Sequence, residues 1–508
     1  MREVWVNRKT MMSKSRPFEL SVRSVKRRSI LGWALGGSAG ALLAACSSAP
    51  AAPTSQPAAA TTAGQSKSTP SSPPTTKPAS TTSSQTAAAP THAAASTAAP
   101  AASAAKSAAT GTVDFTHWLI GGSQGVPTAK QIDQLWAQQH PAITLKDEIP
   151  SGNYWTAVLT RLAGGDPPDA MAIDNYNITA LAVKGGAMPL DDLVKGSKFD
   201  LSMFYPISLI EGVYQGKRYG LPYIGSTRVL GYNIDAFTGA GLDTPDKLWD
   251  QGKWTWDSFL EVSQKLTKKD SGGRTTQFAF QINKTLWGLT RWIMANGGSL
   301  LNSDLTACLI DQPPAVQAVQ FLQDLVFKHK VAPTAAEMQG ANLQQIGRLA
   351  MWGDWRGNVI FERTFKFKWD ITLPPIVPAV GKTALYKGNS MAIYPKSKNA
   401  DAAWEFTQFI CGPEASKLYT NLGGATPVQT PDVKNVFLTS SPPQNNHYYL
   451  DPLSENYAKL LPLNPSWPEM ESKADSHLDE IFVEQKDVKV VLGEIKADIE
   501  KLLAAMPH

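Results

Sequence analysis

Strand-like and helix-like spacings of apolar residues alternate over the first part of the folded chain. Short apolar runs predict strands, and apolar residues three and four positions apart predict amphipathic helices between them. A capping-box pattern of Thr128 and Gln131 predicts the start of the first helix. The resulting βαβαβ order predicts a parallel sheet with helices on its faces. The expected strands are 113–119, 143–149 and 170–173, and the expected helices are 128–140 and 154–163.

The rest of the folded chain is richer in helical spacing. Residues 214–219 have a hairpin-like pattern, and 229–233 form an extended apolar segment. With about 400 residues after the tether described below, the chain can bury a sizeable core, and its size favours two lobes. The expected helices are 256–266, 286–294, 315–327, 400–411, 414–422 and two more within the last fifty residues, and the expected strands are 278–282, 349–352 and 390–394.

The first 45 residues have the features of an export signal. Arg27 and Arg28 precede an apolar run, 31–45, which four glycines interrupt and which is too short to span about 30 Å of hydrocarbon as a helix. The run ends in Leu43-Ala44-Ala45-Cys46, which resembles a bacterial lipobox. We therefore expect 1–45 to be a twin-arginine lipoprotein signal peptide, and a diacylglyceryl group on Cys46 to hold the exported protein at the outer face of the cytoplasmic membrane.

The composition separates a tether from an acidic folded region. Residues 46–110 are almost entirely Ala, Ser, Thr and Pro, with three lysines and no acidic residue, which predicts a disordered tether. The formal net charge of the chain is +5. Removing the nine basic and two acidic residues of 1–45 and the three tether lysines from totals of 48 and 43 leaves 36 Lys and Arg against 41 Asp and Glu, a net charge of −5. This balance argues against a nucleic-acid partner.

The chain has three cysteines. With Cys46 acylated, Cys308 and Cys411 remain, and they either pair or stay as two buried thiols. Folding before export in a reducing cytosol suits the second alternative.

Motif-like stretches follow one another from residue 162 to residue 406. They are 162–170 (LAGGDPPDA), 186–193 (GAMPLDDL), 214–222 (YQGKRYGLP) with 230–237 (LGYNIDAF), 347–355 (GRLAMWGDW), and 388–393 (GNSMAI) with 397–406 (SKNADAAWEF). In order and spacing they resemble the extracellular solute-binding proteins of ABC importers, in the sugar-binding group that includes maltose-binding proteins.

The resemblance implies an α/β, two-lobed, periplasmic-binding-protein-like fold with a ligand cleft and a hinge. The strands that cross between the lobes are then expected near 220–226 and 387–391. One lobe comprises 111–220 with 388–440, and the other comprises 221–387 with 441–508.

Candidate ligand residues follow from what a sugar offers, which is apolar ring faces and a rim of hydroxyls. Trp118, Trp352 and Trp355 lie at strand ends or in the loops after them, where open α/β sheets place ligands. By the resemblance, Trp355 occupies the position of a cleft-facing aromatic and Asp174 that of a hydroxyl-binding carboxylate. Each also has a structural alternative, a core position or a helix cap. Further candidates with the same two alternatives are Ser123, in a glycine-rich loop, and Tyr223, Trp287, Trp292, Asn296, Asp354, Asn389 and Trp467.

The function that the resemblance implies is capture of a sugar or oligosaccharide for an ABC permease. The ATPase would be a separate chain because the sequence has no Walker-type loop. No metal is expected, since the seven histidines include no His-x-x-x-His pair. A monomer without cofactor is expected as well. The alternatives are a lipid-anchored glycan hydrolase and a binding protein for a polyamine, a metal complex or glycerol phosphate. Residues 121–125 fit G-x-S-x-G, but Val126 and Pro127 separate them from the helix that a nucleophile elbow would enter directly.

Overall fold

The computed structural model describes residues 109–116, 125–148, 154–340 and 342–506. All of them belong to one compact unit, Ala98–His508. Among these residues no helix combines the length and the apolar character that crossing a membrane requires. The expected signal peptide, residues 46–108 of the expected tether (which include Cys46), Trp118 and Ser123 lie outside the described residues.

The first sheet has six strands, in the order β13-β12-β3-β1-β2, with β6 paired to β12. β1 is parallel to β2 and to β3, as the βαβαβ pattern predicts. The sheet as a whole is mixed, because β12 runs antiparallel to β3 and to β6. The strands are β1 (Gly111–Thr116), β2 (Ile143–Glu148), β3 (Ala170–Asp174), β6 (Leu221–Thr227), β12 (Ala384–Ile393) and β13 (Ala458–Lys459).

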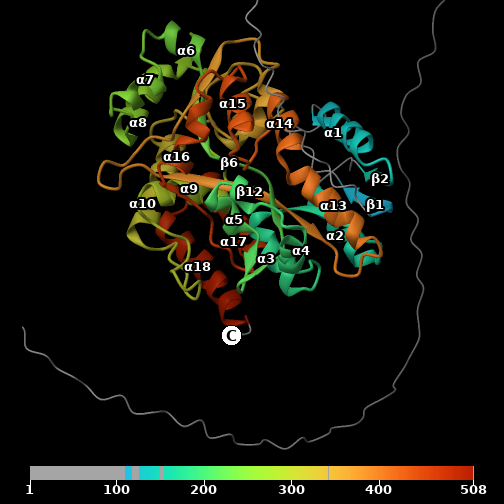
Figure 1. The fold of residues 1–508 in the computed structure, drawn as a ribbon. Helices are drawn as coiled ribbons and strands as arrows, with labels where there is room; N and C mark the ends of the chain where they lie inside the picture. Colours follow the sequence, from blue (N-terminus) through green and yellow to red (C-terminus); the bar gives the residue numbers. More distant parts are fainter. Residues whose placement is uncertain (1–108, 117–124, 149–153, 341, 507–508) are drawn as a thin grey trace, which may run out of the picture. The chain divides into compact units, whose positions relative to one another are not determined.

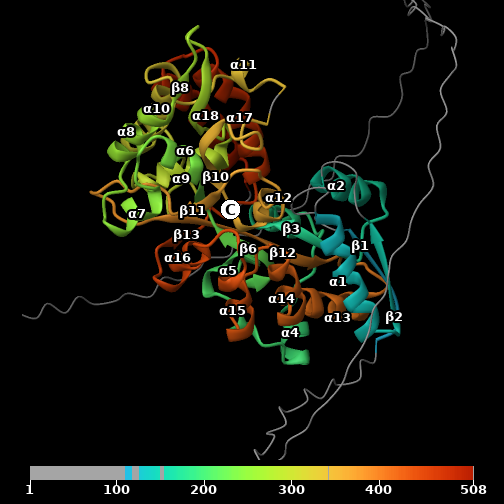
Figure 2. The same cartoon turned by 90° about the horizontal axis from the view of Figure 1, so that it is seen from above.

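Helices around the first sheet enclose one hydrophobic core. Phe115 of β1, Trp136 of α1 and Phe406 of α13 meet there, with the Phe115 and Phe406 ring centroids 4.8 Å apart. Figure 2 shows α1 and α13 beside β1 and β2. The helices are α1 (Val126–Gln139), α2 (Tyr154–Gly164), α3 (Asn175–Val183), α4 (Asp191–Ser197), α5 (Pro206–Glu211), α13 (Ala400–Cys411), α14 (Pro413–Asn421) and α15 (Pro431–Thr439).

The predicted start of α1 is wrong by two residues. The helix begins at Val126 after Gly125, and Thr128 lies inside it as a buried residue without a capping role. Pro127 stands in the first turn, where its missing N–H leaves no helical hydrogen bond unmade. Proline therefore replaces the capping box as the feature that starts this helix.

The second sheet has five strands in the order β11-β7-β10-β9-β8. β9 and β10 are parallel, whereas β7 is antiparallel to both of its neighbours. The expected extended segment 229–233 is β7, and the expected hairpin at 214–219 is the pair β4 and β5. The five strands of the sheet are β7 (Val229–Asn233), β8 (Lys268–Lys269), β9 (Thr275–Gln281), β10 (Leu349–Asp354) and β11 (Trp369–Thr372). The hairpin, a separate two-stranded sheet, consists of β4 (Val213–Tyr214) and β5 (Lys217–Arg218).

The last two helices pack on the second sheet's helices. Figures 1 and 2 show α17 and α18 (red) near α9 and α10 (yellow-green), and these helices share one hydrophobic core. Cys308 lies in this core and Cys411 in the first, so both are buried free thiols. The remaining helices are α6 (Ile234–Gly239), α7 (Pro245–Asp250), α8 (Trp256–Leu266), α9 (Leu286–Ala295), α10 (Pro313–Phe327), α11 (Ala335–Met338), α12 (Val359–Glu362), α16 (Asp451–Ser454), α17 (Trp467–Phe482) and α18 (Val488–Ala504).

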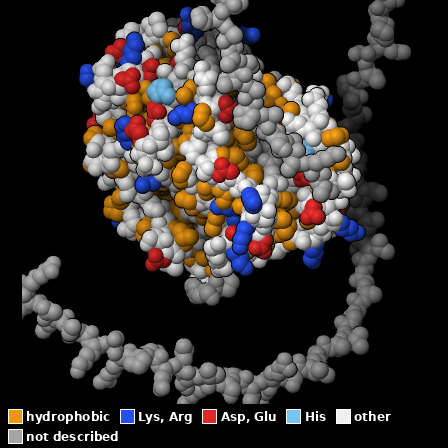
Figure 3. Space-filling model, in the orientation of Figure 1, with side chains coloured by type: hydrophobic (Ala, Val, Ile, Leu, Met, Phe, Trp, Pro, Cys, Tyr) orange, Lys and Arg blue, Asp and Glu red, His pale blue; other side chains and the backbone are white. Residues whose placement is uncertain are grey.

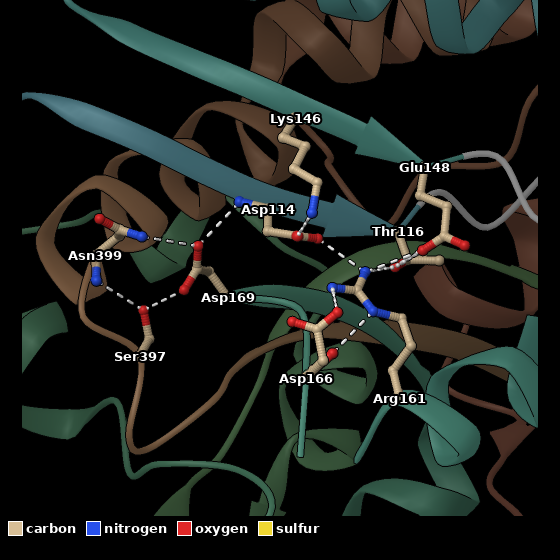
Figure 4. Close-up of polar contacts among 9 residues, drawn as sticks. All are labelled: Asp114, Thr116, Lys146, Glu148, Arg161, Asp166, Asp169, Ser397 and Asn399. Atoms are coloured by element: carbon tan, nitrogen blue, oxygen red, sulfur yellow. Dashed lines mark hydrogen bonds and ion pairs between the residues drawn. The ribbon is translucent and has the colours of Figure 1, made fainter. Parts of the chain in front are cut away.

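A polar network joins β1, β2 and α2 at the edge of the first sheet (Figure 4). Arg161 Nη1 donates to Asp114 Oδ1 at 2.8 Å and to Glu148 Oε2 at 3.0 Å, and its Nε donates to the Asp166 carbonyl at 2.9 Å. Lys146 Nζ lies 2.6 Å from the other oxygen of Asp114. The positive charge of Arg161 is thus matched by acidic side chains, which identifies this network as structural.

Candidate functional site

A pocket of about 570 Å³ lies at one end of the second sheet. The parallel strands β9 and β10 end at this pocket, and α9 begins beside it, which is the edge where open α/β sheets bind ligands. Arg228, between β6 of the first sheet and β7 of the second, also lines it. The residues that line the pocket include Arg228, Trp287, Arg291, Trp352, Asp354 and Trp355.

Arg228 is a buried arginine held between two indole rings. Arg228 is only 5% exposed. Its guanidinium carbon lies 4.9 Å from the ring centroid of Trp355 and 5.4 Å from that of Trp287. These distances are typical of cation–π contacts. Burial lowers the pKa of Arg228 to about 10, so the guanidinium stays charged at neutral pH.

Arg291, on α9, brings a second guanidinium to the same pocket. It lies against the backbone of Gly353, where any Cβ would overlap the guanidinium group. Burial, together with the charge of Arg228, lowers the pKa of Arg291 to about 10. Gly353 therefore makes room for Arg291, and the two arginines are close enough to repel each other.

Asp354 ends β10 and is fixed by several donors. Its Oδ1 accepts from the Trp355 backbone N–H at 2.6 Å and from Asn358 Nδ2 at 3.0 Å, and its Oδ2 accepts from the Tyr449 hydroxyl at 3.3 Å. Burial raises the pKa of Asp354 to about 6. The neighbouring Glu362 is also fully enclosed, and burial and the charge of Asp354 raise its pKa well above the usual value.

Trp352 supports the pocket wall from inside the protein. It is 3% exposed, and its Nε1 donates to Glu362 Oε1 at 2.7 Å. Its ring lies against Gly231 of β7, where an added Cβ would overlap the indole. The ring is therefore fixed by packing, although Trp352 also lines the pocket.

A second polar cluster, centred on Asp174, lies next to this pocket. Asp174 Oδ1 is 3.0 Å from Lys387 Nζ and 3.2 Å from Asn389 Nδ2, and its Oδ2 accepts from the Tyr176 hydroxyl at 3.1 Å. Lys387 Nζ is 5.6 Å from the Trp287 ring, so Trp287 joins the cluster to the pocket. Asp174 stands before α3 but makes no capping hydrogen bond, which removes the helix-cap alternative.

Other sequence candidates lie in hydrophobic cores. Tyr223 is 5% exposed and packs against Tyr419, with ring centroids 6.2 Å apart. Trp292 is surrounded by aromatic rings, although its edge reaches a second, smaller cavity beside Arg228. Trp467 is fully buried near Tyr176. Asn296 Nδ2 donates to the Pro314 carbonyl at 2.8 Å. These contacts favour the alternative that the sequence left open, in which the residues have structural positions and do not contact the ligand.

The sequence reasoning missed the positive charges at the pocket. Arg228 stands alone between two apolar runs, 221–225 and 229–232, and Arg291 stands in an apolar helix. A charged residue within a segment that is otherwise expected to be buried is a signal for function, because an ion is rarely buried without a partner. That signal was present at both positions.

The profile of the family described as bacterial extracellular solute-binding protein matches residues 122–417. Among curated relatives, the arabinooligosaccharide-binding protein of Bacillus subtilis (strain 168) is 25% identical over 337 residues, which are 62% of this chain and 74% of the relative.

Solved structures show the same fold. An ABC substrate-binding protein of Listeria monocytogenes, in complex with cycloalternan, superposes with a TM-score of 0.71 at 24% identity, over 78% of this chain and 99% of that chain. UgpB of Mycobacterium tuberculosis, in complex with glycerophosphocholine, superposes with a TM-score of 0.67 at 19% identity, over 78% of this chain and 99% of that chain. These likenesses confirm the predicted two-lobed α/β fold.

Proposed function

We propose, on the premise that the chain belongs to the family of bacterial extracellular solute-binding proteins, that it captures a sugar or an oligosaccharide and delivers it to an ABC permease. The observation that carries this proposal is the pocket of about 570 Å³ at the ends of β9 and β10. Its volume lies within the range of roughly 300–1,000 Å³ that is usual for small-molecule sites. The cycloalternan and arabinooligosaccharide named for two of the similar proteins support a carbohydrate ligand.

Aromatic and polar groups at the pocket suit carbohydrate. Trp287 and Trp355 bring indole rings to its wall, and Gln281, Asn283 and Asn358 bring amide groups. Indoles pack on apolar ring faces, and amides both donate to and accept from hydroxyls. We propose Trp287 and Trp355 as ligand contacts, with Asp354 holding the loop in which Trp355 stands.

A binding role is better supported than glycan hydrolysis. Asp354 is the carboxylate that lines this pocket among the described residues, and the nearby Glu362 is hydrogen-bonded to Trp352 and Gln344 inside the protein. Glycosidases need two carboxylates about 5–10 Å apart across a sugar, both facing the ligand. The enclosed Glu362 does not provide the second.

A thermal-shift screen of mono- and oligosaccharides against the full chain tests the binding role. We expect one carbohydrate to raise the melting temperature and to be recovered unchanged after long incubation. Release of new reducing ends from an oligosaccharide, abolished by Asp354→Asn, would instead establish a hydrolase.

For localisation, we propose that lipid on Cys46 holds the exported protein at the outer face of the cytoplasmic membrane, where it meets its permease as a monomer. The support is the sequence Leu43-Ala44-Ala45-Cys46 after a twin-arginine pattern. Cys46→Ser should move the protein from the membrane fraction to the medium. Mass spectrometry that finds residues 1–45 still attached and Cys46 unmodified would contradict the anchor.

A further inference from the structure

Two buried guanidinium groups at the pocket lack partners. Arg228 Nε and Nη1 and Arg291 Nε are enclosed but have no hydrogen-bond partner among the described residues. Neither arginine forms an ion pair within 4.0 Å with any carboxylate that the structure describes. Buried polar atoms are usually hydrogen-bonded, and at a pocket such open donors can be met by the acceptors of a ligand.

Nearby acidic groups are already engaged. Asp174 is bound to Lys387, and Asp354 accepts from the Trp355 backbone and from Asn358. Lys284, which also lines the pocket, adds another positive charge, although its Nζ points towards the Phe482 ring at 5.8 Å. The pocket wall therefore carries three cationic side chains against one carboxylate, Asp354, whereas the face of the molecule in Figure 3 shows acidic and basic side chains interspersed.

The positions of both arginines are fixed by their surroundings. Indole rings of Trp287 and Trp355 flank Arg228, and the bare backbone of Gly353 accommodates Arg291. Held in this way, the two guanidinium groups keep their mutual repulsion instead of turning away into solvent. An anion between them would remove that repulsion and supply the missing acceptors.

We propose that Arg228 and Arg291 form an anion subsite, and that the captured solute carries a carboxylate or a phosphate group. The planar fork of a guanidinium matches two oxygens of either group, and such charge-assisted hydrogen bonds are roughly twice as strong as neutral ones. The inference deepens the proposed binding function and rests on it. An acidic oligosaccharide or a sugar phosphate fits this subsite, whereas a polyamine, which is cationic, does not.

Paired ligands that differ only in charge provide the test. Calorimetry on the full chain would compare α-1,4-linked trigalacturonate with neutral galactotriose of the same linkage, and glycerophosphocholine with glycerol. Inorganic phosphate serves as a minimal probe in a thermal-shift assay. We expect the charged member of at least one pair to bind at least 10-fold more tightly, and the preferred pair distinguishes a carboxylate from a phosphate source.

Charge-removing variants locate the site. Arg228→Gln and Arg291→Gln should each weaken binding of the preferred anion roughly 10- to 100-fold, since each removes charge-assisted hydrogen bonds. Arg274→Gln is the matched control. It removes the same charge, and Arg274 is exposed in the turn between β8 and β9. Arg228→Lys keeps the charge without the fork and should give an intermediate loss. Thermal melting of every variant checks that it is folded.

Some outcomes overturn the subsite without touching the binding function. A neutral sugar that binds tightly to the wild type and equally to both Gln variants would do so. If every anionic probe, phosphate included, leaves the wild-type melting temperature unchanged, the subsite is also refuted. Turnover of a bound oligosaccharide would refute the proposed binding function instead.

Discussion

Arg161 and Arg228 are the same residue type in opposite surroundings. Arg161 bridges Asp114 and Glu148 in the first-sheet network, and its guanidinium is used for structure. Arg228 is more deeply buried, at 5% exposure, and two indole rings lie against it. Asp174 and Asp354 act on its charge, but no described carboxylate forms an ion pair with it within 4.0 Å. The comparison shows that burial of a charge alone does not indicate function. A buried charge without a protein partner, on the wall of a pocket, does.

The tryptophans divide in the same way. Trp467 is fully buried in the core shared with α17 and α18, whereas Trp355 is partly exposed at the pocket. Trp467→Ala should therefore lower the free energy of unfolding by roughly 3–5 kcal/mol, as expected for truncation of a large core aromatic. Urea denaturation measures this. A variant as stable as the wild type would place Trp467 outside the core and weaken the contrast.

Arg161→Gln should give the next largest effect. It leaves Asp114 and Glu148 without their shared partner, so we expect the free energy of unfolding to fall by roughly 1–3 kcal/mol while solute affinity stays unchanged. Arg228→Gln should show the reverse, with lower affinity and a smaller loss of stability than Arg161→Gln, because it breaks no ion pair with a described carboxylate. Equal losses of stability in both variants would erase the distinction between the two arginines.

Trp355→Ala should have a smaller effect, on binding alone. Trp355→Ala removes an indole ring that we propose packs on the ligand, and one ring contact of about 1 kcal/mol corresponds to a roughly 5-fold fall in affinity with the fold intact. Calorimetry with the preferred solute measures the loss. Unchanged affinity would remove Trp355 from the site, and Trp254→Ala, in the core, serves as a control that should lower stability.

The smallest predicted effect is the pH dependence of stability, which has opposite signs for Asp114 in the first-sheet network and Asp354 at the pocket. Burial alone would raise the pKa of Asp114, but hydrogen bonds from Arg161 and Lys146 lower it. The ionised Asp114 therefore stabilises the folded state above the unfolded pKa, and this stabilisation is lost as pH falls through the lower pKa of the folded state. Burial raises the pKa of Asp354 to about 6, so the ionised carboxylate disfavours the folded state at neutral pH. This penalty decreases as pH falls through about 6 and disappears only below the unfolded pKa.

Comparison of the wild type with Asp354→Asn isolates the pH-dependent effect of the Asp354 carboxylate on stability. From pH 7 to pH 5 the wild type should gain up to about 1 kcal/mol of stability relative to Asp354→Asn. Parallel melting curves for the two proteins over this range would show that Asp354 is not protonated there. Asp114→Asn should be less stable than the wild type at neutral pH, and this difference should disappear in strongly acidic solution.

Local patterns explain how much of the fold was predictable. The strands β1 to β3 and their parallel pairing follow from short-range spacing, because a βαβ unit is set by neighbouring segments. The antiparallel pairing of β6 with β12 joins residues about 160 positions apart and leaves no local trace. The start of α1 was missed because Pro127 and Thr128 are both acceptable first-turn residues.

The candidate site was predictable in its place and less so in its chemistry. Trp355 and Asp354 were expected at a strand end, and the structure brings both to the pocket. Helical spacing predicted the helix that contains Trp292, and Trp467 was a candidate because it is aromatic. Neither observation shows which neighbouring side chains enclose these two residues. The arginines were overlooked because a sugar-binding expectation directs attention to aromatics and acids, and their lack of partners is visible only in three dimensions.

A crystal structure of the full chain with its solute would show directly whether the two arginines bind an anion. We expect a carboxylate or phosphate whose oxygens lie within hydrogen-bond distance of the Arg228 and Arg291 guanidinium groups, in the pocket lined by Trp287 and Trp355. A neutral sugar whose hydroxyls occupy those positions, or a solute bound away from both arginines, would contradict this expectation.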